Sequence, residues 1–264
     1  MPLADVNGTK LNYRLDGSEQ GTVVMFSNSL ASALSMWDLQ VPPLVKAGYR
    51  VLRYDSRGHG QSEVPAGPYS IEMLTADAVG LMDALGLEKV HFCGLSMGGM
   101  VGQMLGARHG DRLISLTLSS TSAHMPPREI WDERIETVRE NSMDAVVDAT
   151  IDRWFTKAGQ ERLGAEVEKI RRSILHTRTD GFCAACAAIQ NMDQRDSIRT
   201  ISTRTLVLVG KHDPGTPVSA AEFIHQRISS SELRVISDAA HLVNVEQSSV
   251  FNKALLKFIE KRGA

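Results

Sequence analysis

The chain has 264 residues, with 29 Lys and Arg against 31 Asp and Glu, and 42% of its residues are apolar. These values are typical of a globular protein, and the near-neutral charge excludes a nucleic-acid-binding protein with a basic stripe. No apolar stretch is long enough to cross a bilayer, and the first residues lack the pattern of a signal peptide. We therefore expect a cytoplasmic protein with neither nucleic acid nor membrane as a partner.

Short apolar runs rich in β-forming residues alternate along the chain with longer segments of helical pattern. Strands buried on both faces are predicted at residues 23–26, 50–54, 90–93, 113–118, 205–209 and 233–236. Helices are predicted at 71–86, where Ser70 is a candidate N-cap, at 97–109 and at 247–261. The alternation predicts an α/β fold in which helices flank a mostly parallel central sheet.

The alternation stops between residues 122 and 199, where no clear strand is found. Two apolar faces recur there at helical spacing. The first contains Met143, Val146, Val147, Ile151 and Trp154, and the second contains Phe182, Cys186, Ile189 and Met192. Because the strands resume afterwards, we expect an all-helical cap of residues 122–199, inserted into a core domain of residues 1–121 and 200–264.

The strongest chemical motif is Gly94-Leu95-Ser96-Met97-Gly98, which follows a predicted strand and opens a predicted helix. A nucleophile elbow has this pattern and place, because its serine sits on a strained turn whose neighbours must be glycine. The helix that begins there favours developing negative charge. We therefore expect Ser96 to be a nucleophile rather than part of a glycine-lined packing turn.

A serine nucleophile needs a histidine base and an acid that orients it, and after an elbow the acid precedes the histidine along the chain. His241 lies on the loop after the last predicted strand, and Asp213 lies on the loop after the strand before it. These are the loops that the elbow requires. Asp238 is the competing acid but is too close in sequence to His241, and His212 is expected to be an exposed neighbour.

The oxyanion that forms during attack on a carbonyl needs two hydrogen-bond donors. The backbone N–H of Met97, directly after the nucleophile, is expected to be one of them. The other is expected from the loop 27–31, which reads Ser-Asn-Ser-Leu-Ala, and we assign it to Leu30. The small polar residues of this loop can hold it through local hydrogen bonds.

Other residues of chemical interest lie outside this set. The segment after the second predicted strand contains Arg57, which could hold a substrate carboxylate, and His59, for which a scaffold role is expected. Cys183 and Cys186 have the spacing of a redox or zinc pair but lack a second ligand pair, so buried structural cysteines are expected. Trp154 is expected in the cap core and at the pocket wall. Neither a metal nor an organic cofactor is predicted.

Taken together, these motifs resemble an α/β-hydrolase-fold enzyme and, in detail, the 3-oxoadipate enol-lactonase family. The resemblance covers nearly the whole chain. It is carried by Ser27-Asn28-Ser29-Leu30, Leu34-Ser35-Met36-Trp37-Asp38, Arg57-Gly58-His59-Gly60, Arg153-Trp154-Phe155-Thr156 and the segments 51–55, 67–72, 92–99 and 241–246. Two departures are Ala31, where glycine is expected, and the acid loop 210–217, which matches approximately.

The resemblance implies that Ser96, Asp213 and His241 form a catalytic triad and that Leu30 and Met97 supply the oxyanion donors. It implies a serine hydrolase that opens 3-oxoadipate enol-lactone to 3-oxoadipate through an acyl-enzyme, in bacterial catabolism of aromatic compounds. The expected partner is thus a small-molecule lactone or ester, while the sequence leaves the oligomeric state open.

The carboxylate of such a substrate would need a cation, for which Arg57, Arg153 and Arg172 are candidates that spacing does not separate. Two alternatives stay open at this point. A carboxylesterase or a lactonase of other specificity would use the same triad, and a non-catalytic binding protein can have the same fold. The cap is the part that would discriminate among them.

Overall fold

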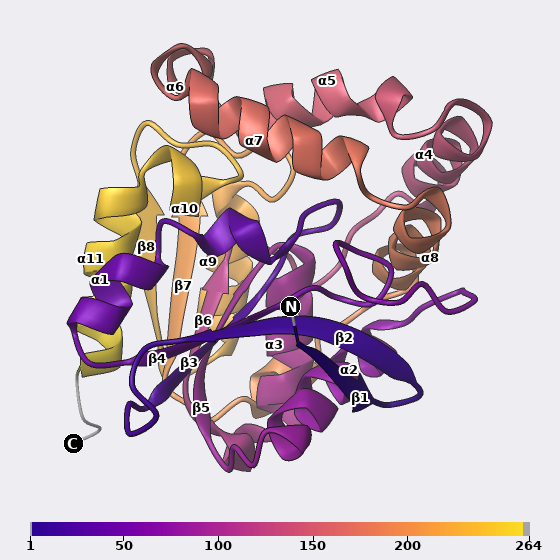
Figure 1. Ribbon diagram of the computed structural model, residues 1–264. Coiled ribbons are helices and arrows are strands. Elements are labelled where there is room, and N and C mark those ends of the chain that lie inside the picture. Colours follow the sequence, from indigo (N-terminus) through magenta and orange to yellow (C-terminus); the bar gives the residue numbers. More distant parts are fainter. Residues whose placement is uncertain (1, 261–264) are drawn as a thin grey trace.

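A computed structural model describes residues 2–260 of the chain. Within this range eight strands form one sheet in the order β1-β2-β4-β3-β5-β6-β7-β8 (Figure 1). The strands are β1 (Leu3–Val6), β2 (Thr9–Asp16), β3 (Val23–Ser27), β4 (Arg50–Tyr54), β5 (Val90–Leu95), β6 (Leu113–Ser119), β7 (Thr205–Gly210) and β8 (Ser231–Ile236). The pairs β1–β2 and β2–β4 are antiparallel, and the other neighbours among these strands are parallel. The predicted α/β fold with a mostly parallel sheet is confirmed.

The six predicted strands are all present, although β8, at the edge of the sheet, is partly exposed instead of buried on both faces. β1 and β2 are the two strands that the sequence pattern did not reveal. They form a hairpin whose turn residues Asn7 and Gly8 have φ angles of 45° and 73°. Two positive φ values are typical of the tight hairpin turn that Asn-Gly favours. Burial alternates along β1 instead of being continuous, as it is in the central strands. The hairpin therefore contains no continuous apolar run by which its strands could be recognised in the sequence.

Helices cover both faces of the sheet (Figure 1). On one face lie α2 (Ile71–Ala84), α3 (Met97–Arg108) and α9 (Val218–Arg227), and on the other lie α1 (Val41–Lys46) and α11 (Ser248–Glu260). The hydroxyl of Ser70 accepts the N–H of Met73 at 3.1 Å and caps α2 as predicted. The helix predicted at 247–261 corresponds to α11, which follows the short α10 (Val243–Glu246), and Lys261 lies outside the described residues.

Between β6 and β7, the described chain contains helices and one isolated bridge, which joins His124 to Asp193. The helices are α4 (Arg128–Asn141), α5 (Asp144–Trp154), α6 (Lys157–Arg162), α7 (Gly164–Leu175), α8 (Thr179–Gln190) and a 3-10 turn at Ser197–Thr200. The two predicted apolar faces correspond to α5 and α8. Helices α4–α8 lie above the carboxyl ends of the parallel strands (Figure 1). The domain limits at residues 122 and 199 stay a prediction.

The strand order places a crevice beneath this helical layer. β3 and β5 are neighbours in the sheet, but the chain leaves β3 toward β4 on one side and returns to β5 on the other. At such a switch point, loops at the carboxyl ends of adjacent strands diverge and leave room for a ligand. The loops that diverge here are the 27–31 loop and the turn at Ser96, so the fold brings the predicted oxyanion loop and nucleophile together.

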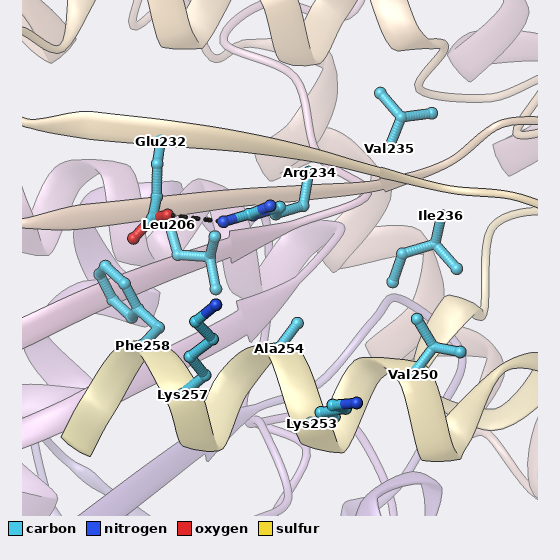
Figure 2. A pocket seen from close by; sticks show the side chains of 10 residues that line it. All are labelled: Leu206, Glu232, Arg234, Val235, Ile236, Val250, Lys253, Ala254, Lys257 and Phe258. Carbon is cyan, nitrogen blue, oxygen red and sulfur yellow. Dashed lines mark hydrogen bonds and ion pairs between the residues drawn. The ribbon is translucent and has the colours of Figure 1, made fainter. Parts of the chain in front are cut away.

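A second hollow lies elsewhere on the core, between β8 and α11. Figure 2 shows Phe258, Ala254 and Val250 of α11 facing Leu206 and Ile236 of the sheet. Among the described residues, it shares no lining residue with the cavity under the cap. The predicted site residues Ser96, His241 and Leu30 line the cavity under the cap, and none of them lines this second hollow.

Candidate active site

Ser96 lies on the turn between β5 and α3 with a φ of 57° and a ψ of −114°, a sparsely populated backbone conformation that costs about 1–3 kcal/mol. The turn is tight because glycines let backbone segments approach each other. A Cβ atom on Gly94 would lie 2.0 Å from the carbonyl oxygen of Gly98, and one on Gly98 would lie 2.1 Å from that of Ser27. The N–H of Ser96 donates to the carbonyl of Ser119 at 2.9 Å, which ties the turn to β6. The two glycines of the Gly-x-Ser-x-Gly pattern thus allow the close backbone contacts that this strained turn requires.

The loops after β7 and β8 bring Asp213 and His241 into contact. Nδ1 of His241 lies 2.8 Å from Oδ2 of Asp213, and both side chains are buried. Ser96 and His241 line the same cavity. Three side chains that are far apart in the sequence therefore meet at the carboxyl edge of the sheet, in the order that a nucleophile elbow requires.

The two neighbours considered as alternatives lie differently. Asp238 is exposed and has a φ of 54°, on the outer side of the loop before His241. His212 is exposed as well, and its backbone N–H donates to the carbonyl of Ala239 at 2.9 Å. The geometry therefore favours Asp213 over Asp238 as the partner of the histidine.

The surroundings of Asp213 favour its charged form. Oδ1 accepts the N–H groups of Gly215 and Thr216 at 2.9 and 3.0 Å, and Oδ2 accepts the Thr216 hydroxyl at 2.8 Å. Burial raises the pKa of Asp213, but His241 and the hydrogen bonds from Thr216 outweigh it, so the pKa lies below its usual value. Because an ionised carboxylate only accepts, Nδ1 of His241 carries the proton and Nε2 stays free to accept one.

The predicted oxyanion donors are backbone groups on two adjoining turns. Met97 is the first residue of α3, and Leu30 lies on the loop after β3 and lines the cavity. In the described part of the chain, neither N–H donates to a protein acceptor. The loop is fastened to the elbow because the carbonyl of Asn28 accepts the N–H of Gly98 at 2.9 Å. The side chain of Asn28 also donates to the carbonyl of Tyr54 at 2.8 Å.

Ala31, where the sequence departs from the family pattern, has a φ of 59°. Glycine adopts this conformation without strain, which explains why glycine is expected there. Ala31 nevertheless lies in the cavity wall and is buried. Ser32, just after the predicted loop, closes the same turn by donating its hydroxyl to the carbonyl of Ser29 at 2.7 Å.

The cavity between core and cap has a volume of about 310 Å³, which suits a small organic molecule. Ser96 and His241 lie on its core side, and Trp131, Trp154 and Phe182 lie on its cap side. The ring of Trp154 stacks over the His241 ring, with 6.2 Å between the ring centroids and 27° between the planes. Trp154 is therefore part of the pocket wall, as expected, and it covers the imidazole of His241.

Two arginines line the cap side of this cavity, Arg134 from α4 and Arg153 from α5. No acidic side chain lines the cavity, and among the described residues neither arginine forms an ion pair with a carboxylate. Arg153 donates to the Thr150 hydroxyl at 3.1 Å, and the Arg134 guanidinium lies 4.7 Å from the Trp131 ring centroid. Burial lowers the pKa of Arg153 to about 10, and the charge of Arg134 acts in the same direction. The charge of Asp152 acts in the opposite direction on the pKa of Arg153. The cap side therefore carries two arginines that are not paired with a carboxylate among the described residues.

Arg153 was a sequence candidate for substrate binding, whereas Arg134 was missed. A signal for Arg134 existed, because Trp131, Arg134 and Val138 recur at helical spacing in 128–141. Only the folded cap shows that this helix faces the cavity.

Two other predicted arginines are not brought to the site. Arg57 is buried and bound to Asp77 of α2 through both Nε and Nη2, and it does not line the cavity. Arg172 is exposed on α7, where its Nε donates to Glu168 at 3.0 Å. The substrate-binding role expected for Arg57 is therefore not supported by its position, because its charge is already satisfied by a carboxylate.

A buried carboxylate ties the cap to the histidine loop. Oε1 of Glu246 accepts both the N–H and the hydroxyl of Thr156, at the start of α6, and Oε2 accepts the N–H of Ala240 at 2.7 Å. The N–H of Leu242 donates to the carbonyl of Trp154 at 3.0 Å. Of the residues on either side of His241, Leu242 is thus bonded directly to the cap and Ala240 is linked to it through Glu246, a connection that the sequence did not reveal.

Within residues 2–260, no cluster of His, Cys, Asp and Glu side chains is arranged to hold a metal ion. Cys93, Cys183 and Cys186 are buried free thiols, as expected for the Cys183 and Cys186 pair. None of the described helices is long and apolar enough to cross a bilayer.

Known proteins similar to this chain have the fold that the strand order and the site geometry indicate. A family model described as "alpha/beta hydrolase fold" matches residues 22–248, which is most of the chain. The strand order, the strained serine and the loops that carry the acid and the histidine are those of this class. The protein is thus an α/β hydrolase.

More specific relatives lie within this class. The chain is 36% identical over 253 residues to 3-oxoadipate enol-lactonase 1 of Acinetobacter baylyi, covering 96% of this chain and 94% of the relative. The crystal structure of the enol-lactonase from Burkholderia xenovorans matches with a TM-score of 0.96 and 41% identity, over 98% of this chain and 100% of that one. A thermophilic esterase from Thermogutta terrifontis matches with a TM-score of 0.93 and 29% identity, over 100% and 99% of the two chains.

The chain therefore belongs to the 3-oxoadipate enol-lactonase family of the α/β-hydrolase superfamily. It is an enzyme, a hydrolase of carboxylic esters. The resemblance that the motifs indicated is confirmed.

Proposed function

We propose that this enzyme hydrolyses a small carboxylated enol-lactone, 3-oxoadipate enol-lactone, to 3-oxoadipate. The observation that carries the proposal is the pairing of two features in one cavity. Ser96 and His241 lie on one wall, and Arg134 and Arg153 lie on the other, with no acidic residue between them. A substrate with an ester carbonyl at one end and a carboxylate at the other complements both walls.

The proposed first step is attack by Ser96 Oγ on the ring carbonyl while Nε2 of His241 takes its proton. The ionised Asp213 holds the proton on Nδ1 and stabilises the imidazolium that forms. The negative charge moves to the carbonyl oxygen, which accepts hydrogen bonds from the N–H groups of Leu30 and Met97. Collapse of this intermediate opens the ring and leaves an acyl-enzyme on Ser96.

An enol-lactone suits this machinery because of its leaving group. The ring oxygen departs as an enolate or enol, which needs less protonation than an alkoxide and then becomes a ketone. His241 returns the proton that it took from the serine. In the second step His241 takes a proton from water, the hydroxide attacks the acyl carbon, and the proton goes back to Ser96 as the acid product leaves.

The carboxylate of the substrate is proposed to bind Arg153 and Arg134. Arg153 is half-buried and already oriented by Thr150, whereas Arg134 is held against the Trp131 ring. Charge-assisted hydrogen bonds to a partly desolvated arginine are among the stronger polar contacts in proteins. The cap would therefore select carboxylated substrates, and a neutral ester would bind without this contribution.

We also propose that the reaction takes place in the cytoplasm and serves bacterial catabolism of aromatic compounds, the pathway that the family resemblance implies. A carboxylesterase with another substrate is the second candidate, because the similarity to a thermophilic esterase also spans the whole chain. The two candidates differ in what the cap binds rather than in the triad.

The test compares turnover of 3-oxoadipate enol-lactone, generated in situ, with turnover of a short-chain nitrophenyl ester by the wild type and by Ser96→Ala. We expect kcat/KM for the lactone to exceed that for the ester by orders of magnitude. Ser96→Ala should lower kcat by about 10⁴- to 10⁶-fold for both substrates. Turnover of the ester alone would contradict the lactone as substrate and favour the esterase, whereas an active Ser96→Ala would contradict the triad itself.

A further inference from the structure

His59 lies directly behind the oxyanion loop and is only 1% exposed. Its Nε2 accepts the backbone N–H of Ala31 at 3.1 Å. Its Nδ1 lies 3.2 Å from the carbonyl oxygen of Arg57. Ala31 is the residue next to Leu30, whose N–H is the proposed oxyanion donor. The imidazole thus contacts the loop one residue away from the group that would bind the developing charge.

The two partners of His59 fix its protonation state. A backbone N–H only donates, so Nε2 must present a lone pair to Ala31. A carbonyl oxygen only accepts, so Nδ1 must carry a proton toward Arg57. Both bonds exist together only in the neutral imidazole with its proton on Nδ1. A protonated ring would place an N–H against the N–H of Ala31, and the bond to the loop would be lost.

The support behind His59 is rigid. The guanidinium of Arg57 binds both carboxylate oxygens of Asp77 on α2 and also donates to the carbonyl of Asn7 at 3.2 Å. The next residue after Arg57, Gly58, packs against Gly181 at the start of α8, where a Cβ atom on Gly58 would lie 2.7 Å from the Cα atom of Gly181. The segment 57–59 is therefore clamped between α2 and the cap.

The oxyanion loop needs such an external contact. Ala31 holds a φ of 59°, which an alanine does not favour by itself. The N–H of Leu34 donates to Asp55 at 2.6 Å and fixes the far end of the same turn. The ends of the loop are held at Asn28, which is bonded to the elbow, and at Leu34. Within residues 2–260, the bond from Ala31 to His59 is the hydrogen bond that holds the strained residue itself.

We propose that His59 is a positioning residue of the oxyanion hole, which keeps the Leu30 N–H aimed at the reacting carbonyl by accepting the N–H of Ala31. The inference rests on the proposed role of Leu30 in ester hydrolysis. It assigns to the Arg-Gly-His-Gly segment a role in transition-state stabilisation, although none of its side chains lines the cavity. The loss of this contact lowers kcat more than it raises KM, because the oxyanion forms only after the substrate is bound.

The proposal has a pH consequence. Burial lowers the pKa of His59 below its usual value, while the bond to the Arg57 carbonyl and the charge of Asp55 act in the opposite direction. The ring is therefore neutral at neutral pH, and the loop contact is lost only as the pH falls below the usual histidine range. The charged and titratable groups that face this segment are Asp55, Arg57, Tyr69, Asp77 on α2 and Asp180 on α8.

The experiment compares His59→Gln with His59→Phe, using hydrolysis of a nitrophenyl acetate by the full chain. The amide oxygen of glutamine can stand where Nε2 stands and accept the N–H of Ala31, whereas phenylalanine fills the space without an acceptor. We expect His59→Phe to lower kcat by about 10- to 100-fold with little change in KM. His59→Gln should recover kcat to within about threefold of the wild type and should lose less activity than the wild type as the pH falls.

Two controls keep the result interpretable. His91→Gln changes another buried histidine, on β5, whose Nδ1 lies 2.8 Å from the Ser115 hydroxyl away from the cavity, and it should leave kcat unchanged. Ser96→Ala measures the proposed function itself. Circular dichroism and thermal melting establish which variants are folded.

The inference is overturned if folded His59→Phe keeps wild-type kcat while Ser96→Ala is inactive. It is equally overturned if His59→Gln and His59→Phe lose the same activity in proportion to their loss of folded protein, since that pattern indicates a purely structural role. If Ser96→Ala stays active, the proposed function fails first, and the inference about His59 fails with it.

Discussion

The cavity has two walls, and different interactions hold them in place. On the core wall, hydrogen bonds with backbone groups near the ends of parallel strands hold Ser96 and Asp213, and the carbonyl of Asn28 fastens the loop that carries Leu30 to the elbow. On the cap wall, Trp131 and Phe182 are held mainly by the packing of α4 against α8 and by burial in a common apolar cluster, and the indole N–H of Trp131 also donates to the carbonyl of Met125 at 3.0 Å. The core wall thus depends on directional bonds with little tolerance, whereas the cap wall depends on packing that accepts other side chains of similar volume.

This difference separates chemistry from selectivity. The groups proposed to move protons and stabilise charge lie on the core wall, and the two arginines proposed to recognise the substrate lie on the cap wall. A change on the core wall should therefore affect every substrate equally. A change on the cap wall should affect only those substrates that use it, and three predictions test this division.

The largest effect is expected from Asp213→Asn on the core wall. The amide would offer an N–H to Nδ1 of His241 and favour the wrong tautomer, so kcat should fall by about 10⁴-fold for lactone and ester alike. Steady-state kinetics with both substrates measure this loss, with Asp238→Asn as the matched control that should retain activity. A loss confined to one substrate, or a larger loss in Asp238→Asn, would contradict the assignment of Asp213.

The second effect is expected from Arg153→Met on the cap wall. Removing a charged donor from a carboxylate costs about 1.5–3 kcal/mol, so kcat/KM for the carboxylated lactone should fall by roughly 10- to 150-fold. Turnover of a neutral nitrophenyl ester should stay near the wild-type value. Arg172→Met, on the exposed face of α7, is the control and should change neither substrate. Equal losses on both substrates would show that Arg153 supports the cap rather than the carboxylate.

The smallest effect is expected at the contact between Thr156 of the cap and Glu246 of the core. Thr156→Val removes the hydroxyl that donates to Glu246 and caps α6, at a cost of about 1–2 kcal/mol in the free energy of unfolding. Because Glu246 also holds the loop before His241, kcat should fall slightly for both substrates. Thr156→Ser keeps the hydroxyl and should behave as the wild type in urea unfolding and in kinetics. Identical unfolding curves for the two variants would contradict the role of this hydroxyl.

The core wall was predictable from sequence because each of its groups follows a recognisable strand. Ser96, Asp213 and His241 lie on the turn or loops that follow β5, β7 and β8, and the fold brings such positions to one edge of the sheet. The hairpin β1–β2 was also within reach, because Asn7-Gly8 is a strong turn signal between alternating segments. It was not predicted because its strands alternate apolar and polar residues, whereas the predicted strands are continuous apolar runs.

The cap wall was less predictable at α4, which buries few residues, than at α8, where most residues are buried. Trp131 and Val138 are the buried residues of α4, so its pattern is weak among many charges. Two arginines show most clearly what cannot be predicted from the sequence. Arg57 and Arg134 are equivalent in the sequence, and only the fold pairs the first with Asp77 and turns the second toward the cavity. Such long-range pairing has no local signature.

The contact between Gly58 and Gly181 joins the core to the cap outside the cavity, at a point where neither residue can gain a side chain. A methyl group on Gly181 would lie 2.1 Å from the carbonyl oxygen of Gly58. In evolutionary terms, the cap can change its inner surface freely but must keep this pair of glycines, or replace both together with a shift of the backbone. An engineered cap taken from another member of the superfamily would therefore need glycine at the position of Gly181 to seat on this core.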